Sequence, residues 1–246
     1  MAVAPKATTT DTLYGGAVIL RQPASGYRVN VDAPILADFA AQGPRAEVAV
    51  DLGAGVGSVA LGLHHVDAAA HFELVEREAA LVQLATENAR DASMSHRAWC
   101  CELDQGLPEA LRQAADLVVC NPPFFDPAST RQSPYAAKTR ARFGKLEPFL
   151  TAAAAAARGA RTRVTFVYPT RELSSFLAEA ARAQLVPKRL RLVHADPNSP
   201  ARVALIELRR AKPGGLVILP PLYEWAEKGV RSAELARILS GARAQR

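Results

Sequence analysis

The sequence contains one short segment whose residue types suit the binding of a planar amino group, Asn121-Pro122-Pro123-Phe124. Neither proline has an N–H group, so the backbone here offers carbonyl oxygens and few donors. The Asn121 side-chain oxygen and the Pro122 carbonyl could accept both hydrogens of an NH2 group. Phe124 could stack on the flat group that carries it. We expect Asn121, Pro122, Pro123 and Phe124 to form the reaction site.

A second segment, Asp51-Leu-Gly-Ala-Gly-Val-Gly57, has the composition of a ligand-binding loop. Its three glycines let the chain turn sharply and bring backbone N–H groups against a ligand, next to the start of a helix. The G-x-G-x-G spacing differs from the G-x-G-x-x-G spacing of dinucleotide-binding proteins. We therefore expect Asp51, Gly53 and Gly55 to bind a methyl donor, S-adenosyl-L-methionine (SAM).

Further donor contacts are expected from carboxylates that follow the next strands. Glu76 ends the run 72–76, where a carboxylate can accept both hydroxyls of an unphosphorylated ribose. Asp104 follows the third expected strand and could accept a hydrogen bond from the adenine amino group of the donor, a role for which Glu102 also competes. Asn121 is assigned to the donor as well as to the substrate, because the two sites meet there.

The elements that position these residues alternate between short apolar runs and stretches with helical spacing, the pattern of an α/β protein with βαβ units. Leu173, Phe176, Leu177 and Ala180 are spaced as one face of a helix packed on a sheet. Strands are expected at 47–52, 71–75, 97–103, 117–120, 163–168, 189–194 and 202–209.

The last two expected strands are joined by the turn-forming residues 195–200, which leave no room for a helix, so they must pair antiparallel. A mostly parallel sheet that ends in an antiparallel C-terminal hairpin is typical of the seven-stranded, Rossmann-like class I methyltransferase fold. A dinucleotide-dependent dehydrogenase would continue with parallel units.

The 246 residues, 49% hydrophobic and 22% charged, predict a folded protein. We expect an N-terminal lead-in at 1–40, a SAM-binding catalytic domain at 41–212 and a C-terminal extension of that domain at 213–246. No apolar run is long enough to span a membrane and residues 1–10 lack the features of a secretory signal, so a cytoplasmic location without membrane binding is expected.

Cysteine and histidine usage gives no indication of a metal site. The three cysteines, Cys100, Cys101 and Cys120, lie in apolar runs, and neither they nor the five histidines show metal-ligand spacing. We expect no metal, and reduced cysteines in the core.

The net charge of +6 favours a polyanionic partner, although a solvated basic surface is the alternative. Residues 128–145 carry five basic and no acidic side chains directly after the amino-acceptor motif, and their aromatic residues could stack on unpaired bases. We select Arg140, Arg142 and Phe143 as RNA contacts. More positive charge follows near the expected hairpin, at Lys188, Arg189, Arg191, Arg209, Arg210 and Lys212.

Together, Asp51–Gly57, Glu76 and Asn121–Phe124 resemble the motifs of the bacterial N6-adenine methyltransferases that modify an adenine beside the anticodon of valine tRNA. The segment 27–36 resembles the lead-in of that family, with Asn30 where a glycine is usual. The resemblance implies SAM-dependent N6-methylation of an adenine in tRNA. It also implies that the lead-in covers the donor pocket, with Asp32 near its polar end as a further donor-binding residue.

Other functions fit the same motifs. A guanine amino group in rRNA and a glutamine amide in a protein also present a planar NH2 group to an Asn-Pro-Pro-aromatic site. A non-catalytic RNA-binding module on the same fold is a third alternative, and a nicotinamide-dependent oxidoreductase a fourth. The oligomeric state stays open.

Overall fold

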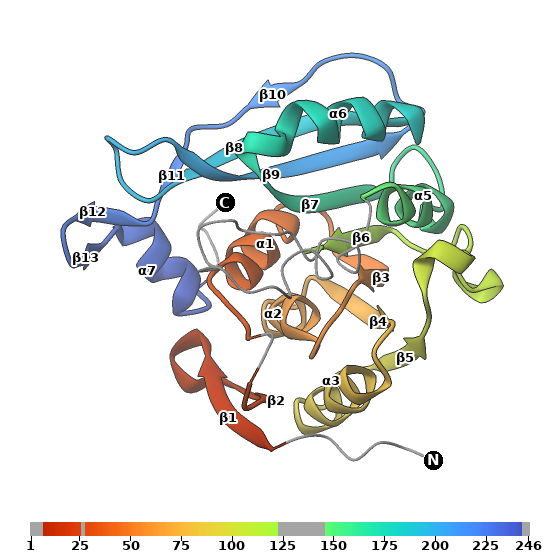
Figure 1. The fold of residues 1–246 in the computed structure, drawn as a ribbon, viewed down its shortest axis with the longest axis horizontal. Coiled ribbons are helices and arrows are strands. Elements are labelled where there is room, and N and C mark those ends of the chain that lie inside the picture. The colour runs from red at the N-terminus through yellow and green to blue at the C-terminus, as the bar shows by residue number, and fades with distance from the viewer. Residues whose placement is uncertain (1–6, 26–27, 123–145, 243–246) are drawn as a thin grey trace, which may run out of the picture.

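The computed structural model describes residues 7–25, 28–122 and 146–242. Its centre is a mixed sheet with the order β10-β8-β9-β7-β6-β3-β4-β5, and β11 adds to the outer edge of β8 (Figure 1). The strands are β1 (Thr8–Leu13), β2 (Val18–Pro23), β3 (Ala46–Leu52), β4 (Ala69–Glu76), β5 (His96–Cys100), β6 (Leu117–Cys120), β7 (Arg163–Pro169), β8 (Leu185–His194), β9 (Ala201–Arg210), β10 (Val217–Ile218), β11 (Leu222–Tyr223), β12 (Trp225–Glu227) and β13 (Val230–Arg231).

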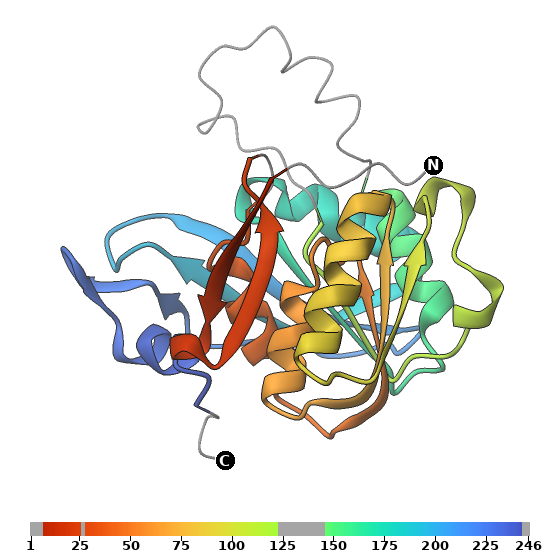
Figure 2. The same ribbon diagram turned by 90° about the horizontal axis from the view of Figure 1, so that it is seen from below.

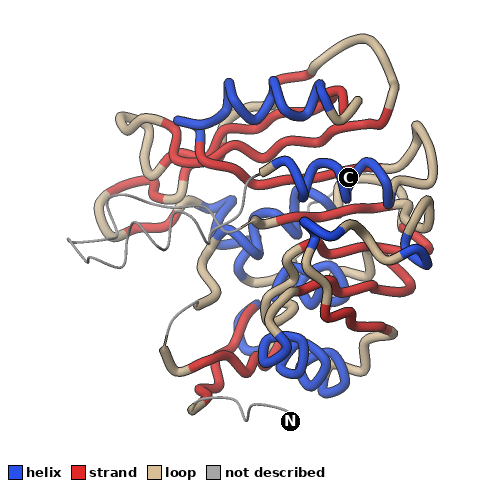
Figure 3. The backbone as a smooth tube through the Cα atoms, turned by 45° about the vertical axis from the view of Figure 1, so that its right-hand side comes forward, coloured by secondary structure: helices blue, strands red, loops and turns tan. Residues whose placement is uncertain are grey.

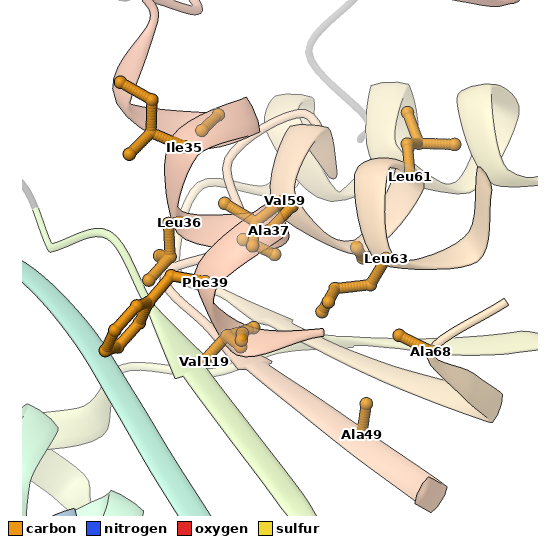
Figure 4. Close-up of a cluster of buried hydrophobic side chains, with 14 of the residues drawn as sticks. Ile35, Leu36, Ala37, Phe39, Ala49, Val59, Leu61, Leu63, Ala68 and Val119 are labelled. Atoms are coloured by element: carbon orange, nitrogen blue, oxygen red, sulfur yellow. The ribbon is translucent and has the colours of Figure 1, made fainter. Parts of the chain in front are cut away.

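Helices cover both faces of this sheet (Figure 3). On one face, α1, α2 and α3 contribute to one apolar cluster with alternate residues of the strands, such as Ala49 of β3 and Val119 of β6 (Figure 4). On the other face, α5 and α6 form a second cluster with Val50 and Val118. The helices are α1 (Asp32–Ala40), α2 (Ser58–His65), α3 (Ala79–Asp91), α5 (Glu147–Ala156), α6 (Leu173–Arg182) and α7 (Ala233–Leu239).

The seven strands β3 to β9 of the central sheet confirm the expected seven-stranded methyltransferase fold. Strands β3 to β7 run parallel, and β9 is antiparallel to both β7 and β8. The predicted antiparallel hairpin is therefore confirmed. The sequence did not predict the two-residue strands β10 and β11, which lie parallel to β8.

Two hairpins lie outside this sheet, β1–β2 in the lead-in and β12–β13 near the C-terminus. The first packs beside α3 (Figure 2), where the Asn88 side chain bonds both the N–H and the C=O of Arg21. These two hydrogen bonds satisfy a backbone unit that has no strand partner on this side.

Two expectations about the third strand were wrong. Strand β5 ends at Cys100 rather than at residue 103, because the chain turns into a 3-10 helix at Leu103–Gln105. Cys100 is exposed and Cys101 half-buried, and only Cys120 lies in the core. The reason is that β5 forms the edge of the sheet, where one side of the strand has no neighbour.

The order of the strands places their carboxyl ends side by side. Leu52 of β3 pairs with Val75 of β4 on one side and with Cys120 of β6 on the other, so the loops that follow these strands begin at the same level. The connection that follows β3 leads to β4 on one side, whereas the connection that follows the adjacent strand β6 leads to β7 on the other side. In parallel α/β sheets such a switch point is the usual place for a ligand.

Candidate active site

The glycine loop leaves β3 at the centre of this edge. Gly53, Gly55 and Gly57 all have positive φ angles, 72°, 56° and 85°, a region that side chains with a Cβ rarely adopt. The N–H groups of Gly53 and Ala54 donate to the Val75 carbonyl at 2.8 and 3.0 Å, which fastens the loop to the end of β4. Gly57 is the N-cap of α2, so the loop leads directly into a helix N-terminus.

Glu76, at the end of β4, has its carboxylate fixed by backbone N–H groups. Gly55 donates to Oε2 at 3.0 Å, while Arg77 and Glu78 donate to Oε1 at 2.7 and 3.0 Å. The side chain is half-buried; Oε1 already accepts two hydrogen bonds, and Oε2, which accepts one, has a lone pair left for a further hydrogen bond. The carboxylate is thus held in place before any ligand arrives, in a position to accept hydroxyl groups.

Asp51 lies beneath the loop and is 2% exposed. Its Oδ2 accepts a hydrogen bond from the Ala60 N–H of α2 at 3.2 Å. Burial raises the pKa of Asp51 to about 7, a rise that the Ala60 hydrogen bond opposes and the negative charge of Glu76 increases. A cationic ligand nearby would favour the ionised form, so the position is electrostatically suited to a positively charged group.

Phe149 of α5 closes one side of the loop. A Cβ atom built on Gly53 would lie 3.0 Å from Cε1 of the Phe149 ring, so this glycine makes room for the ring as well as for the turn. The sequence analysis missed Phe149. Nothing in its spacing distinguishes it from the other apolar residues of α5.

Asn121 follows β6 directly, one residue beyond the Leu52–Cys120 pair. It is half-buried, and its side chain makes no hydrogen bond within the part of the chain that the structure describes. Pro122 is buried. The structure therefore brings Asn121 and Pro122 to the same edge as the glycine loop. Pro123, Phe124, Arg140, Arg142 and Phe143 lie outside the described residues.

Asp104 is exposed in the 3-10 turn after β5, and Glu102 is half-buried beside it. The turn begins near Glu76, because the Cys101 N–H donates to the Glu76 carbonyl at 2.9 Å. Both carboxylates thus stay in reach of the same edge, and the geometry does not choose between them.

Asp32, at the start of α1, is 1% exposed and both of its oxygens are engaged. Asn30 donates to Oδ2 at 3.1 Å and also accepts from the Asp32 N–H at 3.0 Å. Arg202 of β9 donates to Oδ1 at 2.6 Å and to Glu224 at 2.6 Å. Asn30 thus has a role of its own where the family usually has a glycine. Sequence analysis missed Arg202.

Three of the basic residues near the hairpin are used within the protein. Arg189 and Arg209 both pair with the buried carboxylate of Glu207, at 3.0 and 2.8 Å, and Arg191 pairs with Glu234 of α7 at 2.7 Å. Their charges are therefore balanced by acidic side chains. Arg210 and Lys212 have no such partner among the residues described.

The fold is that of the class I SAM-dependent methyltransferases. Residues 29–138 match the family model of the methyltransferase small domain. The fold is similar to that of a predicted O-methyltransferase from Agrobacterium tumefaciens, with a TM-score of 0.68, 18% identity, and 87% of this chain and 97% of that chain covered. It is also similar to M. jannaschii TYW2 in complex with AdoMet (S-adenosylmethionine), with a TM-score of 0.56, 13% identity and coverage of 85% and 90%.

Two curated relatives are named tRNA1(Val) (adenine(37)-N6)-methyltransferase. The protein from Flavobacterium psychrophilum is 29% identical over 66% of this chain and 70% of its own length. The protein from Porphyromonas gingivalis, strain ATCC 33277, is 28% identical over 77% of each chain. The resemblance inferred from the motifs is confirmed by these matches.

The described residues were compared with the requirements of a membrane-spanning helix and of a metal site. Among the described helices, none combines the length and the apolar character that a membrane crossing requires. Within the same residues, no three histidine, cysteine, aspartate or glutamate side chains gather as metal ligands.

Proposed function

We propose that this protein transfers the methyl group of SAM to the N6 amino group of an adenine in tRNA. The observation that carries the proposal is that Asn121 and Pro122 directly follow β6, whose end is paired with the end of β3 where the glycine loop begins. A donor methyl group and a planar amino group held at these two places would meet at one edge of the sheet. The names of the relatives support adenine and tRNA as the substrate.

For the donor, we assign the glycine loop and the carboxylates around it. Glu76 would accept the ribose hydroxyls, since backbone N–H groups already orient its carboxylate. Asp51 would face the positive end of the donor, and Gly53 and Gly55 would let the backbone approach it. Asp104 would accept from the adenine amino group.

The lead-in, residues 1–40, would cover the donor pocket. Asp32 would act by holding this cover in place, because both of its oxygens are engaged within the protein. Residues 41–212 would carry both sites, and 213–246 would extend the same domain. We propose the cytoplasm as the place of action.

For the substrate, the Asn121 side-chain oxygen and the Pro122 carbonyl would accept the two N6 hydrogens. The nitrogen lone pair of adenine is delocalised into the ring, which makes the amine a poor nucleophile. Two acceptors on NH2 favour a more tetrahedral nitrogen and stabilise the positive charge that develops on it. Pro123 and Phe124 complete the motif, and stacking on Phe124 would set the plane of the base.

The donor supplies an electrophilic methyl group on a positively charged sulfur. The new bond joins N6 to the methyl carbon, the carbon–sulfur bond breaks with its electron pair on sulfur, and N6 releases one proton to water. The chain contributes position above all, because two reactants held near attack distance avoid the entropy cost of meeting in solution. An adenine in a loop is the cheaper target, since a stacked base must first be flipped out.

Incubation with labelled SAM and total bacterial RNA, followed by nucleoside mass spectrometry, tests this proposal. The expected product is N6-methyladenosine in the tRNA fraction, absent with the Asn121→Ala variant. Label in a guanine amino group, in a protein glutamine or in no product would contradict it.

A further inference from the structure

A groove runs between α5 and α6, on the face of the sheet opposite α1, α2 and α3. It consists of two adjoining cavities of about 230 and 400 Å³, which share the wall residues Thr151, Arg182 and Ala183. The smaller one reaches Glu147, the first residue of α5. Because α5 connects β6 to β7, it starts at the edge that carries Asn121 and runs toward the opposite edge. The groove therefore leads away from the proposed transfer site.

The larger cavity is lined by three arginines from three separate elements. Arg112 follows a 3-10 turn, Arg182 is the last residue of α6 and Arg210 is the last residue of β9. No aspartate or glutamate is among the described residues that line this cavity. Three guanidinium groups around one space concentrate positive charge there, and a bound anion would balance that charge.

Few acidic side chains form ion pairs with these three arginines. Arg112 pairs with Glu109 at 2.7 Å, but both side chains are more than half exposed, so the pair is weak. Arg182 and Arg210 form no ion pair with any described residue. They differ in this from Arg189, Arg191 and Arg209, which are paired with Glu207 or Glu234. Planar guanidinium forks of this kind match the oxygens of a phosphate.

The smaller cavity is lined by two carboxylates, Glu147 and Glu179, as well as by Arg182. Glu179 lines it, and one carboxylate oxygen of Glu179, Oε2, is buried without a hydrogen-bond partner in the described part of the chain. A buried acceptor left unpaired is costly, so this oxygen is suited to a ligand that brings a hydroxyl or an amino hydrogen. Ala154 and Ala155 of α5 line the larger cavity with small side chains.

We propose that the α5–α6 groove binds one ribonucleotide unit. Its phosphate would lie among Arg112, Arg182 and Arg210, and a donor hydrogen of its ribose or base would meet Glu179. The inference rests on the proposed function, which supplies an RNA chain next to the start of the groove. The unit would belong to the RNA substrate, on the segment that leaves the transfer site. A free nucleotide has the same chemistry, so the test separates the two sources.

The test uses the full-length protein with the Arg182→Ala/Arg210→Ala double variant. We expect its dissociation constant for unmodified tRNA to rise about tenfold. The slope of log affinity against log salt should become flatter by about 0.7 for each single-strand phosphate that the variant no longer neutralises. KM for tRNA should rise while kcat at saturating tRNA and the affinity for SAM stay within about twofold of wild type. The control is Arg45→Ala/Arg90→Ala, which removes two exposed charges outside the groove and should leave all five quantities unchanged.

A second arm titrates AMP and ADP against wild type and the double variant by calorimetry. Weak competition between AMP and tRNA, together with the loss of tRNA affinity, supports an RNA-borne unit. Nucleotide binding that the double variant loses, with an unchanged tRNA affinity, supports a free nucleotide instead. If neither tRNA nor nucleotide binding changes, the groove is not such a site.

These outcomes are separable from a failure of the proposed function. Wild-type protein that methylates tRNA while the double variant is unaffected in both arms overturns the groove alone. Wild-type protein that methylates no RNA overturns the function, and the nucleotide arm then still decides on the groove. Thermal unfolding of the double variant checks its fold, and the Arg182→Lys/Arg210→Lys variant, which keeps the charge but not the fork, should recover the salt slope.

Discussion

The Gly55 N–H group donates a 3.0 Å hydrogen bond to Oε2 of Glu76, which joins the glycine loop of β3 to the end of β4. The bond links the glycine loop to Glu76, and the two bonded residues lie 21 positions apart in the chain. It orients the carboxylate for a ligand and at the same time fixes the loop conformation. A change at Glu76 should therefore affect both the ribose contacts and the shape of the loop.

We expect Glu76→Gln to weaken SAM affinity by about 10- to 100-fold, because a hydrogen bond to a charged group contributes about 1.5–3 kcal/mol. Calorimetric titration of SAM measures the change. Glu87→Gln is the matched control, since Glu87 lies on the outer part of α3 and bonds only Gln83 in the described structure. An affinity equal to that of wild type would remove Glu76 from the donor site.

The sequence predicted the central strands and the site edge well, for a local reason. Apolar runs such as 117–120 are buried on both faces of a parallel sheet, so their composition identifies them without knowledge of their neighbours. The three glycines require positive φ angles, and this requirement is visible in the sequence too. The short connection at 195–200 likewise fixed the antiparallel hairpin.

The features that the sequence analysis missed depend on contacts between distant parts of the chain or on local turns. Arg202 and Asp32 are 170 residues apart, and no local pattern links them. Phe149 contacts Gly53 only because α5 packs over the end of β3. The end of β5 was misplaced because the apolar pattern continues through Cys101 and Leu103, while a 3-10 turn ends the strand. Strands of two residues such as β10 are too short to show a period.

The raised pKa of Asp51 predicts a pH dependence of donor binding. The carboxyl group has a pKa of about 7, mainly because it is buried. SAM is positively charged at sulfur and at its amino group, so it should bind the ionised form. Affinity should rise with pH up to about 7 and level off above it, with a slope approaching tenfold per pH unit on the acidic side. Calorimetry between about pH 5.5 and 8.5 measures this, and Asp51→Asn should bind more weakly at pH 8 without the slope.

The stability of the ligand-free protein should fall as the pH rises, whereas the affinity for SAM should increase. The folded-state pKa lies above the unfolded value of 3.8, so the folded protein binds the proton more tightly between these values. The stabilisation that the folded state gains by binding this proton is fully present below about pH 4 and is lost as the pH rises through 7. Asp51→Asn should therefore be more stable than wild type at pH 8, by at least about 1 kcal/mol. Thermal unfolding of both proteins at pH 8 measures the difference. Equal midpoints would show that the ionised Asp51 carboxylate does not destabilise the folded protein.

Asn121→Ala should lower kcat at least about 100-fold, the usual effect of losing one group that stabilises charge in the transition state. Donor affinity should stay within about twofold, because the glycine loop, Asp51 and Glu76 supply most of the proposed donor contacts and stay in place. A methyl-transfer assay with tRNA, together with SAM titration, measures both quantities. Asn198→Ala, in the exposed β8–β9 turn, is the control and should behave as wild type. Undiminished transfer by Asn121→Ala would refute the role of this residue.

Gly53→Ala should lower the free energy of unfolding by about 1–2 kcal/mol and weaken SAM binding. The positive φ of 72° is one cause, since a Cβ in this region is strained. The 3.0 Å approach of that Cβ to the Phe149 ring is the other. Phe149→Leu in the same chain should recover part of the stability by relieving the contact. Gly159→Ala is the control, because a Cβ built at Gly159 has no other atom within 4 Å and the φ of Gly159 is not positive. This variant should change the free energy of unfolding by less than about 0.5 kcal/mol.

The Arg202–Asp32 pair should contribute more to stability than an exposed pair of similar geometry. Arg202→Met would leave the Asp32 carboxylate, whose side chain is 1% exposed, with Asn30 as its remaining side-chain partner. Removal of one partner of a buried pair costs about 3 kcal/mol, lessened here because Arg202 is partly exposed. Arg28→Met breaks the Arg28–Asp11 pair at 2.7 Å, where both side chains are more than 40% exposed, and should cost less than about 1 kcal/mol. Urea unfolding of both variants measures the difference. Equal losses would mean that water reaches Asp32 and that Arg202 does not fasten the lead-in to β9.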